Sequence, residues 1–71
     1  MNRVFLNHKP IAEFDNEDEA IYFAGQVVMG EQYYKINFPY TPGTDIVEVE
    51  CEEGIVEIKL SDIEIDGIKL G

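Results

Sequence analysis

The sequence predicts a small α+β domain in which one helix packs on an antiparallel sheet of four to six strands. Three observations predict it: an apolar stripe at helical spacing over about 16–29, two-residue alternation over 46–51 and 55–60, and an Asp-Gly pair at 66–67 between short apolar segments. A chain of 71 residues has room for one domain, 1–71. An all-β small barrel is the alternative.

The N-terminal segment predicts a β-hairpin. Residues 3–6 form a short apolar run, and residues 11–14 could return as its antiparallel partner. The intervening Asn7, His8, Lys9 and Pro10 are typical of a turn.

Residues 16–29 predict the helix. Asn16 followed by Glu19 resembles a capping box, and acidic residues at a helix start are favoured by the helix dipole. Gly30 supplies the stop. The apolar side chains fall on one arc of roughly 160°: Ala20, Ile21, Phe23, Ala24, Val27 and Val28. Because Gly25 costs about 1 kcal/mol in a helix interior, a hairpin of 26–29 and 32–36 turning at Gly30-Glu31 stays open.

The second half of the chain predicts an antiparallel meander with one buried face and one solvent-exposed face. Residues 32–38 alternate until Pro39 ends the pattern. Over 46–51 and 55–60, one face is expected to carry Val47, Val49, Cys51, Val56, Ile58 and Leu60, and the other Glu48, Glu50, Glu57 and Lys59. Residues 63–65 and 68–70 flank Asp66-Gly67 and complete the meander as a hairpin.

Composition excludes several classes of protein. The one cysteine, Cys51, cannot form an intramolecular disulfide, so a reducing cytoplasm is expected. No apolar run is long enough for a signal peptide or a membrane span. A net charge of −10 argues against direct binding to nucleic acid or anionic lipid and favours a basic protein as partner.

The acidic residues of the predicted meander are the first candidate site. Residues 45–71 hold nine acidic and two basic residues, a net charge of −7. Glutamates two apart on a strand leave the same face roughly 6.7 Å apart, close to the spacing of phosphates along a nucleic-acid strand. A basic groove built for phosphates could therefore bind this face. The candidates are Glu48, Glu50, Glu52, Glu53, Glu57 and Glu64. The alternative is a solvated face enriched in acid for solubility.

Two tyrosines are the second candidate. If the core takes the other side chains of 32–38, Tyr33 and Tyr40 are left near the surface, where tyrosine beside acidic groups suits a protein interface. The alternative is that both lie over the edge of the core.

Enzymatic chemistry, a metal and a cofactor are not predicted. Residues 15–19 resemble a calcium loop, but Ala20 and Gln26 stand where an EF-hand needs glycine and glutamate. His8, Cys51 and Ser61 belong to no catalytic, phosphate-binding or zinc motif.

The predicted function is that of a small acidic protein-binding module. In its sharpest form it mimics nucleic acid and occupies a basic nucleic-acid-binding surface of a target protein, as small phage and mobile-element inhibitors do. The alternative is a structural or accessory subunit that oligomerises, for example as a homodimer, to complete a core that is marginal at this size.

Overall fold

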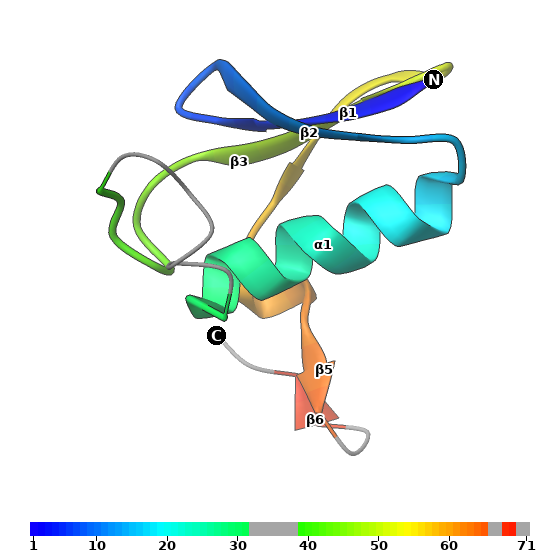
Figure 1. Cartoon of the computed structure of the whole chain (residues 1–71). Coiled ribbons are helices and arrows are strands. Elements are labelled where there is room, and N and C mark those ends of the chain that lie inside the picture. Colours follow the sequence, from blue (N-terminus) through cyan, green and yellow to red (C-terminus); the bar gives the residue numbers. More distant parts are fainter. Residues whose placement is uncertain (32–38, 66–67, 70–71) are drawn as a thin grey trace.

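The computed structural model describes residues 1–31, 39–65 and 68–69 (Figure 1). Its elements, in chain order, are β1 (Asn2–Leu6), β2 (Lys9–Phe14), α1 (Glu17–Met29), β3 (Val47–Cys51), β4 (Gly54–Ile58), the 3-10 helix η2 (Leu60–Asp62), β5 (Glu64–Ile65) and β6 (Ile68–Lys69). The helix packs on one face of a four-stranded antiparallel sheet. This confirms the α+β prediction, and the barrel alternative is wrong because the sheet stays open.

The helix begins and ends at the residues that the sequence indicates. The Oδ1 atom of Asn16 accepts hydrogen bonds from the backbone N–H groups of Asp18, at 2.7 Å, and Glu19, at 3.4 Å. Gly30 ends the helix in the left-handed region at φ 83°. The alternative hairpin is wrong where it is described, because residues 26–29 belong to α1; residues 32–36 lie outside the described residues.

The first strand lies inside the sheet. The strand order is β2-β1-β3-β4, so β1 pairs with the strand after it and with β3 from the second half of the chain. The predicted N-terminal hairpin is confirmed, with Asn7 and His8 at positive φ in the turn. The predicted turn was too long, because Lys9 and Pro10 already belong to β2. An edge strand tolerates proline there, since its outer N–H groups need no partner.

The predicted C-terminal meander is interrupted after β4. The pairs β3–β4 and β5–β6 form as expected, but β5 and β6 make a separate two-stranded sheet (Figure 1). Residues 59–60, predicted as the end of a strand, lie outside β4, because the Asp62 carboxylate accepts the backbone N–H of Lys59 at 2.9 Å and closes the turn of η2. Leu60, expected to point inward, is 37% exposed.

The core lies between α1 and the middle of the four-stranded sheet. Its buried apolar residues are Val4, Leu6, Ala20, Ala24, Val27, Val28, Tyr40, Val47, Val49 and Ile58. The helix makes fewer contacts with β4 than with β1 or β3. Val56 of β4 pairs with the buried Val49 and therefore shares its face, yet it remains 46% exposed.

Candidate protein-binding surface

The predicted acidic face of the sheet exists, but a cation lies within it. Glu48 and Glu57 stand directly opposite each other on β3 and β4. Because β1 pairs with β3, Arg3 lies opposite Glu50, and its Nη2 atom is 2.8 Å from Glu50 Oε1. Glu50 is therefore neutralised by its neighbour rather than left for a partner.

Glu48 is also engaged within the protein. Its Oε1 atom lies 2.9 Å from Nδ1 of His8, and its side chain is only 18% exposed. Phe5 of β1 stands opposite it, and the Arg3 guanidinium lies 6.0 Å from the centroid of the Phe5 ring. The solvent-exposed face of the sheet therefore combines paired charges with apolar groups and does not carry an unbroken row of carboxylates.

Two further predicted site residues, Glu64 and Tyr40, lie elsewhere. Glu64 belongs to the separate β5–β6 sheet and not to the sheet of Glu48, Glu50 and Glu57. Tyr33 lies outside the described residues. The surface position expected for Tyr40 is wrong: only 6% of it is exposed, because it packs into the core cluster. The alternative, in which this tyrosine covers the core, is the arrangement in the structure.

Carboxylates gather instead at one end of the domain, where the N-terminus, the β2–α1 connection and the β3–β4 turn meet (Figure 1). We call this group of Asp15, Glu17, Glu52 and Glu53 the acidic end. These residues surround a cavity of about 240 Å³ that Met1, Asn2 and Cys51 also line. None of the lysine and arginine residues in the described part of the chain lines this cavity.

Asn2 links the two parts of the acidic end, which are the β2–α1 connection and the β3–β4 turn. Its buried side chain donates from Nδ2 to the carbonyl oxygens of Phe14, at 3.3 Å, and Asp15, at 3.2 Å. This fastens the β2–α1 connection to β1, and β1 in turn pairs with β3. Glu52 and Glu53 were predicted site residues, whereas Asp15 and Glu17 were explained by the helix start alone. No local signal places them beside a turn that lies more than thirty residues further on.

The carboxylates of the acidic end affect the pKa of the Cys51 thiol. Its Sγ atom donates to the carbonyl oxygen of Gly54 at 3.4 Å. The side chain of Glu17 raises the pKa of Cys51 above its ordinary value, and loss of solvent contact and the charge of Glu53 act in the same direction, whereas a backbone hydrogen bond from Glu53 acts against them. The thiol is therefore protonated at neutral pH and is a poor nucleophile there.

Replacing Glu17 by glutamine is expected to lower the pKa of Cys51 and speed its alkylation. The substitution removes the carboxylate that raises the pKa of Cys51 most, so the thiolate forms at lower pH. The rate of reaction with iodoacetamide, followed against pH, measures this change. Glu19→Gln is the matched control, because it removes the same charge from the first turn of α1 outside the cavity. Equal shifts in the two variants would show that net charge, and not Glu17, raises the pKa.

Neither a metal-binding cluster nor a membrane-spanning helix is found among the described residues. No three histidine, cysteine, aspartate or glutamate side chains among them are grouped so that they could hold a metal ion. Within the same residues, no helix has the length and apolar character needed to cross a bilayer. Comparison with protein-family models, with curated proteins and with solved structures finds no match.

Proposed function

We propose that this chain is a small acidic protein-binding module that occupies a basic, nucleic-acid-binding surface of a target protein in the cytoplasm. Phage and mobile-element inhibitors of this type act by such occupation. The observation that supports the proposal is the acidic end, whose four carboxylates border one cavity that no described lysine or arginine lines. On the sheet face, by contrast, Arg3 and His8 already engage Glu50 and Glu48.

Charge complementarity would supply both the attraction and the competition with nucleic acid. Carboxylates accept charge-assisted hydrogen bonds from lysine and arginine, as phosphates do. A net charge of −10 on a chain of 71 residues steers it toward a basic surface at a distance. The association should weaken steeply as salt is added, because salt screens exposed charges.

Affinity capture from a lysate of the source cell or its host tests the proposal, with and without nuclease treatment and a salt wash. We expect the chain to capture a basic, nucleic-acid-handling protein, and we expect added nucleic acid to displace the chain from that protein. The combined variant Glu17→Gln, Glu52→Gln and Glu53→Gln should bind this protein about tenfold more weakly and with a shallower salt dependence.

The matched control is Glu13→Gln, Asp18→Asn and Glu19→Gln. It removes the same charge from exposed positions of β2 and of the start of α1, outside the acidic end. Equal losses in both combined variants would remove the acidic end from the proposal. Capture of a target that nucleic acid does not displace would contradict the proposal as a whole.

A further inference from the structure

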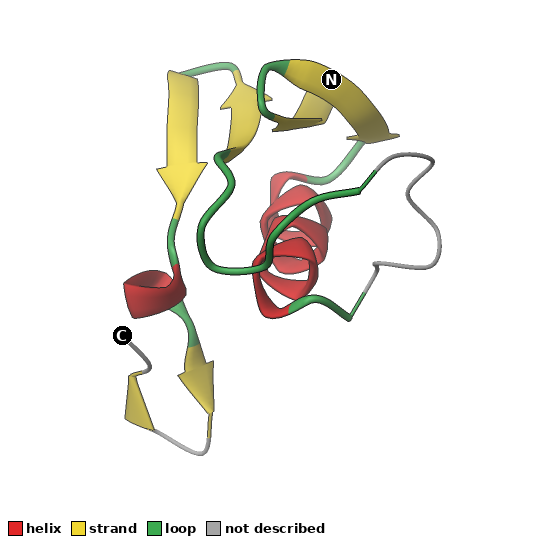
Figure 2. Ribbon diagram, turned by 90° about the vertical axis from the view of Figure 1, so that its left-hand side faces the viewer, coloured by secondary structure: helices red, strands yellow, loops and turns green. Residues whose placement is uncertain are grey.

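Among the described residues, the outer edge of β4 is open and carries no proline, lysine or bulge of the kind that often protects a strand edge. In Figure 2, β4 is the leftmost strand of the four-stranded sheet, and no described element lies beside its outer edge. The opposite edge strand, β2, carries Lys9, Pro10 and an irregular register opposite Val4 and Phe5, all of which discourage pairing with another chain. In contrast, β4 has no proline or lysine and pairs with β3 in an uninterrupted register.

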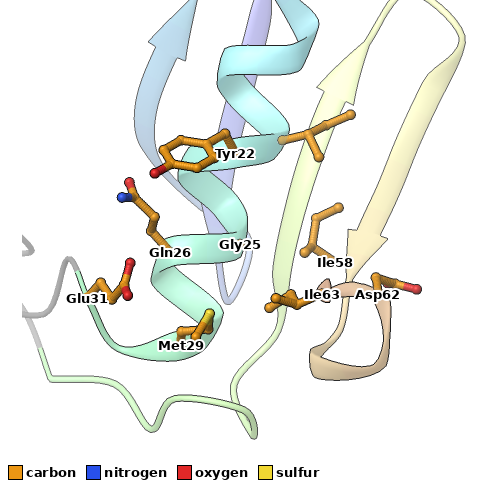
Figure 3. A pocket seen from close by; sticks show the side chains of 9 residues that line it. Tyr22, Gly25, Gln26, Met29, Glu31, Ile58, Asp62 and Ile63 are labelled. Atoms are coloured by element: carbon orange, nitrogen blue, oxygen red, sulfur yellow. The ribbon is translucent and has the colours of Figure 1, made fainter. Parts of the chain in front are cut away.

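Exposed apolar surface adjoins this edge on the helix side of the sheet. Val56 lies on this face of β4 and is 46% exposed. A groove of about 350 Å³ runs between α1 and the segment that contains β4 and η2. Figure 3 shows Tyr22, Gln26 and Met29 on its helical wall and Ile58 and Ile63 on the opposite wall. A strand added beside β4 would place alternate side chains next to Val56 and this groove.

On the face of the sheet that points away from α1, Phe5, Glu48 and Glu57 lie side by side on β1, β3 and β4. Glu57 is the member of this set at the β4 edge. Glu57 stands opposite Glu48, and like charges in direct cross-strand positions destabilise a sheet. A cation beside Glu57 on an added strand would offset this repulsion. Ile55 lies on the same face of β4, opposite Glu50, and is 62% exposed. The methylene stem of a lysine or arginine on the added strand could pack against it.

We propose that the edge of β4 accepts an extended segment of the basic partner as a fifth strand of the sheet. Apolar side chains of that segment lie on the α1 side, over Val56, and a lysine or arginine lies beside Glu57. The inference rests on the proposed function for the positive charge of the partner. A second copy of this chain fits less well, because it also carries a charge of −10.

Two synthetic peptides test the proposal on the intact chain. One is a short peptide of alternating valine and lysine. The other has the same sequence with every backbone amide methylated, which keeps its charge and removes the hydrogen-bond donors of both strand edges. The first is expected to bind about tenfold more tightly, with slowed hydrogen exchange at β4. The ratio of the two affinities isolates strand pairing from charge.

The ratio should fall toward one in Val56→Lys, which places a charge on the apolar side of the edge. Glu57→Lys is a second variant on an exposed position, should Val56→Lys fold poorly. Ile46→Lys is the matched control, because it adds the same charge at a half-exposed residue before β3 and should keep the ratio.

Equal affinities for the two peptides would overturn the edge inference and leave the proposed function standing. Loss of the ratio in Ile46→Lys would overturn it as well. If neither peptide binds and the free chain sediments as a dimer that Val56→Lys dissociates, a second copy occupies β4, and both the edge inference and its basic partner are wrong.

Discussion

Replacing Leu6 by alanine is expected to lower the free energy of unfolding by about 3 kcal/mol. The Leu6 side chain is 0% exposed and lies at the end of β1, the strand that the sheet holds between β2 and β3. The substitution removes buried methyl groups and leaves a cavity that the surrounding helix and strands fill only in part. A domain of this size has a total stability on the order of 5–10 kcal/mol, so the loss is a large fraction of it.

Leu60→Ala is the matched control for this prediction. It is the same chemical change, at a residue of η2 that is 37% exposed and outside the core cluster. We expect a loss of less than about 1 kcal/mol there. Urea unfolding followed by circular dichroism measures both variants. Comparable losses would mean that the packing of η2 contributes to stability as much as the core does.

Replacing Gly30 by alanine is the prediction with the second largest effect. Gly30 ends α1 at φ 83°, a conformation that costs a side-chain-bearing residue about 1 kcal/mol. A Cβ atom there would lie 2.9 Å from Cγ of Pro42, which must shift to make room. The two effects together should destabilise the protein by about 1–3 kcal/mol, measured as a lower Tm and urea midpoint.

The same substitution at Gly25 is expected to have the opposite sign. Gly25 lies inside α1, and a Cβ atom there would meet no heavy atom within 4 Å. Alanine should therefore stabilise the helix by about 0.5–1 kcal/mol. Destabilisation at both positions would show that residues 25–30 do not hold the helical geometry described here.

The elements that the sequence predicts correctly are those that neighbouring residues specify. The Asn16 cap, the apolar stripe of α1 and the Gly30 stop depend on contacts within a few residues. The alternation of β3 and β4 is equally local, and the register that places Glu48 opposite Glu57 follows from the tight turn between them. The end of β4 is missed because the carboxylate of Asp62 turns the chain back toward Lys59.

The candidate site is predicted only in part, because its charges pair across the whole chain. Composition alone establishes the excess of acid, and alternation assigns Glu48, Glu50 and Glu57 to one face. Arg3 reaches Glu50 only because β1 enters the sheet beside β3, a separation of 47 residues. Local periodicity carries no information on strand order.

Strand order therefore decides where the free charge lies. It neutralises Glu50 with Arg3 on the sheet face, and it brings Asp15 and Glu17 to Glu52 and Glu53 at the acidic end. Among the described strands, it also leaves β4, and not β3, at the edge of the sheet. Burial of the apolar residues between α1 and the sheet selects this order, and the surface charges follow the strands that carry them.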